Sequence, residues 1–310
     1  MKVKLGMSPI SWSNDDLPEL GGNTSLEKCL TETRKAGYTG TETGGKFPKN
    51  AKELESVLTS NSLKLVSGWY SGTLINNNIE DEISRIKPQL QLFKSTGASV
   101  IVYGETYRTV QNKIGIPLNR RPKLDQFDIK DYGKKLSQLA EFCEDKGVPL
   151  TFHHHMGTAV ETEEEISKIM LTTSEEVGLL LDTGHLYFAE GNYKNLISKF
   201  GKRINHVHTK DIRKNILDTI SKEKDSFLDC VLKGVFTVPG DGIINYDDVI
   251  SRLYDVGYEG WIIVEAEQDP KKANPLAYAI KGYQALESCL LYTSDAADEG
   301  LGVDLGGRRI

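Results

Sequence analysis

The chain has 310 residues, of which 38% are hydrophobic and 26% charged, and its formal net charge is −6. This composition is typical of a globular protein with one large core, and the acidic balance removes the main electrostatic attraction to nucleic acid or to an anionic membrane. No apolar run is long enough to cross a bilayer, and Cys29, Cys143 and Cys230 are widely separated, which suits a reducing compartment. We therefore expect a cytoplasmic protein with a small-molecule partner; homo-oligomer formation is left open.

The C-terminal residues 289–310, "CLLYTSDAADEGLGVDLGGRRI", differ in character from the rest of the chain. They resemble the translation of a transposon-type sequencing adapter that was read through in frame. Segments of this origin are excluded from fold reasoning. We expect residues 1–288 to form the folded domain and residues 289–310 to be a non-native tail.

Four segments share one pattern, in which a charged helix end is followed by a glycine and then by an apolar run. They lie around Gly37, Gly97, Gly147 and Gly257. Glycine relieves the left-handed backbone at a helix end, and a run rich in Val, Ile and Leu is typical of a strand buried on both faces. Helices and parallel strands are therefore expected to alternate along the chain.

Eight strands are expected, near residues 4–7, 40–43, 64–69, 99–103, 149–153, 178–182, 206–208 and 261–265. Eight strand–helix units in about 250 residues predict a single-domain (β/α)₈ TIM barrel whose active site lies at the C-terminal ends of the strands. A doubly wound open sheet is the alternative, but no glycine-rich phosphate loop follows the first strand. The long polar stretches 104–128 and 211–241 follow the fourth and seventh strands, where we expect substrate lids, surface decoration or oligomer contacts.

Metal-ligand residue types gather at the ends of the last four predicted strands. These residues are His153 and His155, then Asp182 and His185, then His208, and finally Glu265 and Glu267. All six histidines of the chain lie between residues 153 and 208. Imidazoles and carboxylates that converge from separate rigid strands are what a divalent cation needs, so the sequence predicts a metal site with open positions for substrate.

The two-residue period of a strand separates the side chains within "TFHHHMGT", residues 151–158. His153 and His155 are expected to face the barrel mouth together, whereas His154 points the other way. By the same alternation His206 shares a side with His208, and Glu265 shares one with Glu267. Trp12 and Trp69 are expected mainly to be buried in the core, and the alternative is that they supply an apolar wall for the ring of a substrate.

Several motifs resemble those of a known superfamily. "LDTGH" at 181–185, "HVHTKD" at 206–211 and "IIVEAEQDP" at 262–270 resemble the xylose-isomerase-like barrels, in which Glu, Asp, His and Glu bind one divalent metal. A closer resemblance is to the inosose dehydratase family, through "MSPISWSNDDLPELGG" at 7–22, "ETGGKFP" at 42–48, "HHHMGT" at 153–158, "VPGDGIINYDDVI" at 238–250 and "EAEQDPKKANPLAYA" at 265–279. This resemblance covers nearly everything before Cys289.

The resemblance implies a ligand set and an activity. Asp182, His208 and Glu265 match three superfamily ligands, but His153 stands where the superfamily usually has a glutamate. The softer, less anionic set is consistent with Mn²⁺ or Co²⁺. The implied reaction removes water from 2-keto-myo-inositol, beginning with loss of a proton next to the ketone, and the resemblance also suggests glutathione as a cofactor, although no residue pattern shows a site for it.

For acid and base catalysis the sequence offers Glu267, His185 and His155, with Glu267 and His185 as the leading candidates. Lys46, which follows two glycines, and Lys210 are candidate donors to substrate oxygens. Two other functions remain open. One is a sugar epimerase or aldose–ketose isomerase with the same barrel and metal, and the other is a non-catalytic barrel that binds a sugar or inositol.

Overall fold

The computed structural model describes the backbone of residues 2–302 and the side chains of residues 2–291. Within these residues, eight parallel strands close into a barrel in the order β1-β10-β7-β6-β5-β4-β3-β2. The barrel strands are β1 (Val3–Met7), β2 (Gly40–Thr43), β3 (Lys64–Gly72), β4 (Ile101–Glu105), β5 (Leu150–His153), β6 (Gly178–Asp182), β7 (Ile204–Thr209) and β10 (Gly260–Val264). The predicted TIM barrel is confirmed.

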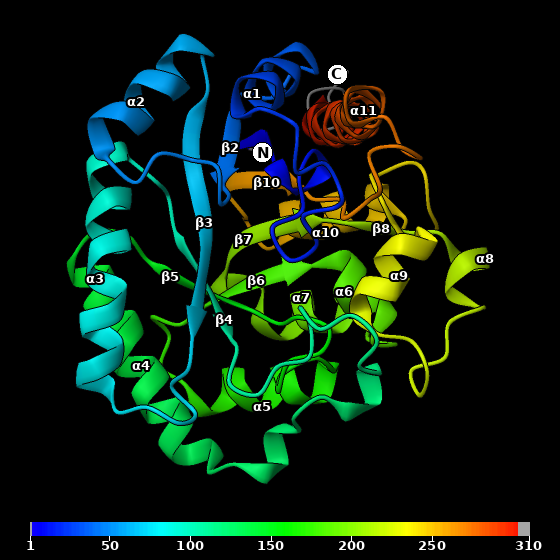
Figure 1. Cartoon of the computed structure of the whole chain (residues 1–310). Helices are drawn as coiled ribbons and strands as arrows, with labels where there is room; N and C mark the ends of the chain where they lie inside the picture. Colours follow the sequence, from blue (N-terminus) through cyan, green and yellow to red (C-terminus); the bar gives the residue numbers. More distant parts are fainter. Residues whose placement is uncertain (1, 303–310) are drawn as a thin grey trace, which may run out of the picture.

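Helices follow the strands and form an outer layer around the barrel (Figure 1). They are α1 (Leu26–Lys35), α2 (Ala51–Ser60), α3 (Ile79–Thr96), α4 (Ile129–Asp145), α5 (Glu163–Thr172), α6 (Thr183–Phe188), α7 (Tyr193–Phe200), α10 (Tyr246–Asp255) and α11 (Pro275–Gly302). The stretch after β7 adds α8 (Lys214–Leu217), α9 (Phe227–Lys233) and the short antiparallel pair β8 (Asp211–Ile212) and β9 (Phe236–Thr237). None of the described helices is both long and apolar enough to cross a membrane.

Local sequence explains where these helices begin and end. Side chains of Ser, Thr, Asn or Asp accept hydrogen bonds from the first-turn amides of α1 to α5, α7 and α10, which satisfies donors that a helix leaves unpaired. The four glycines of the repeated pattern all have positive φ, from 72° at Gly97 to 110° at Gly37. The strands that follow them are buried on both faces, as the apolar runs predicted.

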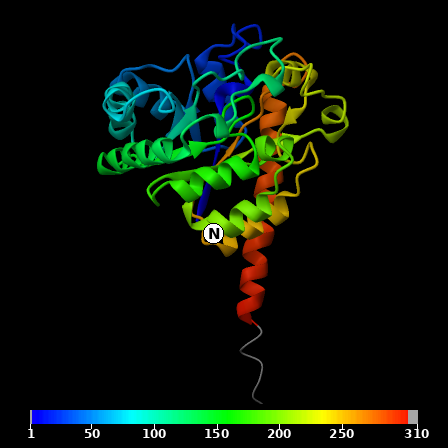
Figure 2. The same cartoon turned by 90° about the horizontal axis from the view of Figure 1, so that it is seen from below.

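The C-terminal helix α11 does not stop at the boundary expected from sequence. Its backbone continues past residue 288 to Gly302, and its last turns project away from the barrel (Figure 2). Cys289, the first residue of the expected tail, is 7% exposed and packs in the core. The side chains from residue 292 onward lie outside the described residues, so the assignment of 289–310 as a tail stays a prediction.

Candidate metal centre and active site

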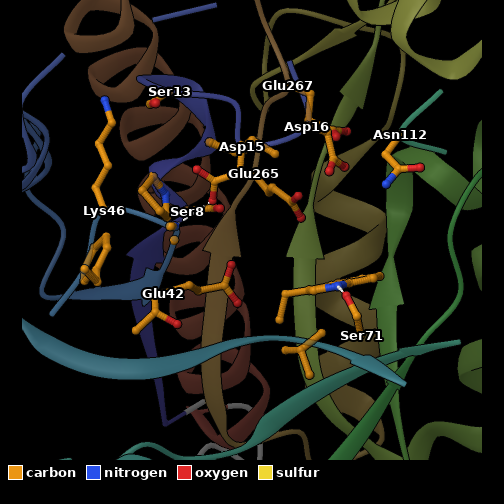
Figure 3. A pocket seen from close by; sticks show the side chains of 18 of the residues that line it. Ser8, Ser13, Asp15, Asp16, Glu42, Lys46, Ser71, Asn112, Glu265 and Glu267 are labelled. Carbon is orange, nitrogen blue, oxygen red and sulfur yellow. Dashed lines mark hydrogen bonds between the residues drawn. The ribbon is translucent and has the colours of Figure 1, made fainter. Parts of the chain in front are cut away.

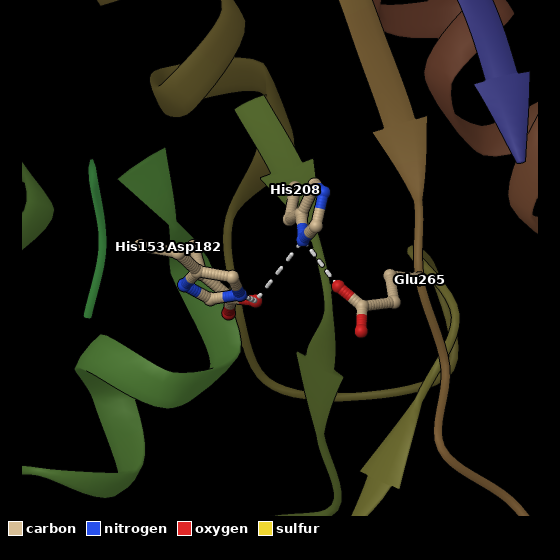
Figure 4. A group of neighbouring side chains, drawn as sticks. All are labelled: His153, Asp182, His208 and Glu265. Atoms are coloured by element: carbon tan, nitrogen blue, oxygen red, sulfur yellow. Dashed lines mark ion pairs between the residues drawn. The ribbon is translucent and has the colours of Figure 1, made fainter. Parts of the chain in front are cut away.

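Four side chains converge where the late strands end. His153 is the last residue of β5, Asp182 the last of β6, His208 lies near the end of β7, and Glu265 directly follows β10. One ligand atom from each lies within 4.8 Å of the others, and all four residues are buried (Figure 4). The structure therefore brings together the four residues that the sequence predicted as metal ligands.

The local structure leaves one atom of Asp182 and one of His208 pointing into this group. Asp182 caps α6, because its Oδ1 accepts a hydrogen bond from the amide of His185 at 2.8 Å, and its Oδ2 is left over. His208 is fixed from the other side, since its Nε2 lies 3.0 Å from Oε1 of Glu42 and donates to it. The remaining Nδ1 lies 3.7 Å from Asp182 Oδ2 and in contact with Glu265 Oε2.

These inward-facing atoms fit a cation. Within the described residues, Asp182 Oδ2, His208 Nδ1 and Glu265 Oε2 are buried and have no hydrogen-bond partner, and His153 Nε2 lies 4.0 Å from Asp182 Oδ2. His208 Nδ1 and Glu265 Oε2 contact each other as an ion pair. Buried polar atoms without partners are costly, and a divalent metal would satisfy them at once. Imidazole and carboxylate together suit Mn²⁺, Co²⁺ or Zn²⁺.

The protonation states also suit a cation site. Burial raises the pKa of Glu265, but the Lys210 ammonium and the His208 ring outweigh it, so the net pKa lies below its usual range and the carboxylate stays ionised. Burial lowers the pKa of His153 well below its usual range, with neighbouring His208 adding to the effect, which keeps a neutral ring. Burial opposes the charged form of His208, yet the carboxylates of Glu42 and Glu265 raise its pKa well above normal, so a metal at Nδ1 would displace a proton.

Sequence reasoning missed Glu42 as a site residue. It lies in β2, is 5% exposed, and its Oε1 accepts from Ser67 Oγ at 2.6 Å, His206 Nε2 at 3.1 Å and His208 Nε2 at 3.0 Å. Its place at the C-terminal end of a predicted strand was the signal that could have found it. A carboxylate on the far nitrogen of a metal-binding imidazole fixes the ring and raises its basicity.

A second polar group lies beside the first and contains His155, His185 and Glu267, whose ligand atoms are also within 4.8 Å of one another. The rings of His155 and His185 have centroids 4.0 Å apart. Lys210 reaches into this group, with Nζ 2.5 Å from Glu267 Oε2 and 2.9 Å from His185 Nε2. His185 therefore uses Nε2 as an acceptor for this lysine.

His155 has the opposite arrangement. Its Nδ1 donates to the carbonyl of Met156 at 2.8 Å, so its Nε2 carries a free lone pair. Burial, followed by the charge of Lys210, lowers the pKa of His155 to about 4, which keeps the ring neutral. His154 lies outside the pocket lining, as expected, and its Nε2 accepts from the Asp182 amide at 3.4 Å.

A cavity of about 480 Å³ opens over both groups. His153, His155, His208, Glu265 and Glu267 line it, whereas His185 does not. The two glutamates are labelled in the view of the cavity in Figure 3. This volume is in the usual range for a small-molecule site. Of the two interpretations of Trp69, the structure favours the apolar wall over burial in the core. This side chain is only partly buried and lines the cavity, with edge contacts to His153 at 5.6 Å and His155 at 5.8 Å between ring centroids.

Lys46 lines the cavity but is held at its edge. Its Nζ donates to the carbonyls of Gly22 at 2.8 Å and Gly21 at 3.4 Å, and also contacts that of Thr24. In Figure 3 its amine points away from Glu265 and Glu267. The structure therefore does not bring Lys46 to the other predicted catalytic residues; it ties the loop after β2 to the loop after β1.

The two long stretches differ in their relation to the cavity. Six residues of the loop after β4 line it, including Arg108, whose φ of +59° is rare for a residue other than glycine. Buried Arg121 anchors this loop, donating to the carbonyl of Thr158 at 3.0 Å and to both oxygens of Glu165 at 3.0 Å. No residue of 211–241, all of which the structure describes, lines the cavity.

Comparison with known proteins places this site in a family. The family model described as "Xylose isomerase-like TIM barrel" matches residues 30–289. A crystal structure of the IolI protein with a bound zinc atom superposes with a TM-score of 0.63 at 19% identity, covering 94% of this chain and 97% of that one. At this identity the likeness shows the fold alone.

Two curated relatives are much more similar in sequence. The rhizopine catabolism protein MocC of Rhizobium meliloti is 46% identical over 286 residues, which are 92% of this chain and 88% of the relative. The inosose dehydratase of Geobacillus thermodenitrificans is 41% identical over 293 residues, 93% of this chain and 98% of the relative. The resemblance drawn from the motifs is confirmed. The chain therefore belongs to the xylose isomerase-like TIM-barrel family and, within it, to the inosose dehydratases, which are hydro-lyases.

Proposed function

We propose that this chain is a metal-dependent dehydratase that removes water from 2-keto-myo-inositol to give a trihydroxycyclohexane-dione. The observation that carries the proposal is the convergence of His153, Asp182, His208 and Glu265 beside a cavity. Three of these four residues line the cavity, and so do His155 and Glu267. The relatives named inosose dehydratase, at 39–41% identity, supply the substrate class. The four residues suit Mn²⁺ or Co²⁺ as the resident ion.

The difficult step is loss of a proton from the carbon next to the ketone. When bound, a divalent metal supplies positive charge that stabilises the enolate formed by this loss. The ionised carboxylates of Asp182 and Glu265 and the neutral ring of His153 would hold it. Glu42 would keep the His208 ring oriented with Nδ1 inward.

We assign proton transfer to the two candidates that line the cavity. His155 has a free Nε2 lone pair toward the substrate space, because its Nδ1 is committed to the Met156 carbonyl. It is our candidate for the base that removes the proton. Glu267 lines the cavity and shares a short hydrogen bond with Lys210, so it can pass a proton to the departing hydroxyl.

The other two candidates have supporting roles in this proposal. His185 lies outside the cavity lining and accepts from Lys210, so it positions that lysine. Lys46 shapes the cavity through the loop carbonyls that it binds. Trp69 gives the ring of the substrate an apolar wall.

The cellular compartment, the glutathione cofactor and the absence of nucleic-acid and membrane partners stay predictions. The thiols of Cys29, Cys143 and Cys230 are free and buried, which suits a cytoplasmic enzyme. Glutathione remains implied by the family resemblance. The lack of nucleic-acid and membrane partners rests on net charge.

The direct test is to strip the purified full chain of metal, reload it with Mn²⁺ or Co²⁺, and add 2-keto-myo-inositol. We expect metal-dependent growth of the ultraviolet absorbance of a conjugated dione. A new sugar peak without that absorbance would support the epimerase or isomerase instead. No turnover, together with no change of melting temperature on adding metal, would support the non-catalytic barrel.

The assignment of His155 is tested by the substitution His155→Gln. General-base removal costs roughly 10²- to 10⁴-fold in kcat, and we expect a loss in this range with metal content unchanged. His185→Gln is the matched comparison, because this residue lies just behind His155 but outside the cavity. A larger loss of kcat in the His185 variant would reverse the assignment.

A further inference from the structure

The polar group around His155, His185 and Glu267 has the composition of a second metal site. Its three ligand atoms lie within 4.8 Å of one another, and Glu267 Oε2 is 3.9 Å from His185 Nε2. Metals of this class bind nitrogen and oxygen at about 2.0–2.2 Å, so donors around one ion are about 3–4 Å apart. By spacing and chemistry this group resembles the four-residue centre beside it.

A lysine already binds two of the three residues of this group. Lys210 Nζ lies 2.5 Å from Glu267 Oε2, 2.9 Å from His185 Nε2 and 3.4 Å from Glu265 Oε1. It is also 3.9 Å from Asp182 Oδ2, and its side chain is completely buried. The ammonium thus uses the same lone pairs of His185 and Glu267 that a metal ion would use, and it reaches two carboxylates of the neighbouring centre.

The fold makes room for this lysine. A Cβ atom on Gly184, the residue before His185, would lie 2.7 Å from Lys210 Cγ, so the lysine stem passes where only glycine leaves space. The ring of Phe236 lies 5.4 Å from Nζ, which favours a cation there. The position is therefore built for a positive charge on a side chain.

We propose that Lys210 is a built-in substitute for a second divalent cation, and that it keeps the centre mononuclear. The inference rests on the proposed metal centre of His153, Asp182, His208 and Glu265. Buried carboxylates need compensating positive charge, and the ammonium supplies it without a second ion. If the side chain is shortened, the vacated space and the freed lone pairs form a second site that can take a metal.

The test measures metal stoichiometry. Wild-type chain, Lys210→Ala and Lys210→Met are purified in the presence of Co²⁺, desalted, and analysed for cobalt per chain by mass spectrometry and for visible cobalt absorbance. We expect one cobalt in the wild type and two in Lys210→Ala, a twofold rise. Lys210→Met keeps the volume of the side chain without its charge, so we expect it to bind one.

Every other result contradicts either the inference about Lys210 or the proposed metal centre. One cobalt in both the wild type and Lys210→Ala overturns the inference but leaves the proposed metal centre intact. No cobalt in the wild type overturns the metal centre, and the inference with it. Two cobalts in Lys210→Met would show that the lysine does not exclude the ion by filling its place. A Lys210→Ala chain that does not fold even with Co²⁺ also overturns the inference, because the second ion should restore the lost charge.

Discussion

The two halves of the barrel mouth are built differently. At β5, β6, β7 and β10 the strand ends themselves deliver His153, Asp182, His208 and Glu265 to one point. At β1 to β4 much of the cavity wall comes from the loops that follow the strands, including Lys46 and Arg108. The comparison teaches that side chains which must meet within a few ångströms lie on the hydrogen-bonded barrel, whereas loops set the shape of the cavity.

Two buried glutamates, one from each half of the mouth, differ in the direction of their pKa shifts. Glu265, in the late half, has a lowered pKa because Lys210 and His208 overcome the effect of burial. Glu105, at the end of β4 in the early half, has a pKa raised to about 7, chiefly by burial, although the amide of Tyr107 and the hydroxyl of Tyr103 partly offset it. The cationic side chains of Lys210 and His208 keep the Glu265 carboxylate ionised, whereas at Glu105 only hydrogen bonds oppose the effect of burial.

The contrast between the two halves of the barrel mouth would fail most clearly if Asp182 were not needed for metal binding and turnover. Asp182→Asn keeps an oxygen that can cap α6 but removes the charge at Oδ2. We expect loss of bound metal and a fall in kcat on the order of 10³-fold, since a metal supplies several kcal/mol of transition-state stabilisation. Metal analysis and the dione assay measure both effects. Retained metal with normal turnover would place the centre elsewhere.

The next largest effect is expected on the free energy of unfolding, through the raised pKa of Glu105. A carboxyl group whose pKa is raised in the folded protein favours folding while it is protonated. This contribution to stability is lost as the pH rises from 4.5, the pKa of the group in the unfolded chain, to about 7, its pKa in the folded protein. Glu105→Gln has no such loss. We expect the free energy of unfolding of the variant, relative to wild type, to increase by up to about 3 kcal/mol over this pH range.

Urea denaturation of both proteins at several pH values measures this difference. Only the trend with pH matters, because glutamine replaces one acceptor oxygen with an amide group and changes the absolute stability. Glu55→Gln, at an exposed position in α2, is the control. If the difference between variant and wild type were flat from pH 4.5 to 7, Glu105 would not be the buried, uncompensated carboxyl described above.

Glu42 is an early-half side chain that binds two histidines of the late half, and its substitution sharpens the comparison. Glu42→Gln retains an acceptor for His208 Nε2 but removes the charge that makes the ring more basic. Losing such a partner typically weakens metal binding about 10- to 100-fold, and we expect the lower end of this range. Chelator competition measures the affinity. Ser67→Ala, which removes the 2.6 Å hydrogen bond to Glu42 and the 3.2 Å contact with His206 Nε2 but keeps the Glu42 carboxylate, is the control and should have a smaller effect.

The sequence predicted the late half of the mouth better than the early half, for a physical reason. Strand ends have a fixed period, so the placement of His153, His155 and Glu267 around the mouth followed from alternation along buried apolar runs. The exposure of the Lys46 and Trp69 side chains depends on loop geometry and on packing across the barrel. The pattern of neighbouring residues in the sequence does not predict the loop geometry or the packing. Glu42 was missed because its role depends on a histidine 166 residues away in sequence. The hydrogen bonds of Lys210 are likewise long-range and became visible only in the folded barrel.

The smallest effect is expected at the end of α11, far from both halves of the mouth. Deleting residues 292–310 should leave kcat unchanged and shift Tm by no more than about 1 °C, because the predicted non-native tail is expected to contribute nothing to the barrel. A deletion that starts at Cys289 should cost more, about 1 kcal/mol or a few degrees, because Cys289 is 7% exposed and packs in the core. Thermal unfolding of the two truncations beside the full chain separates these cases. A large loss of activity in the shorter deletion would mean that the C-terminal residues belong to the enzyme. Equal melting temperatures of the two truncated proteins would place the domain boundary at residue 288, where the sequence alone put it.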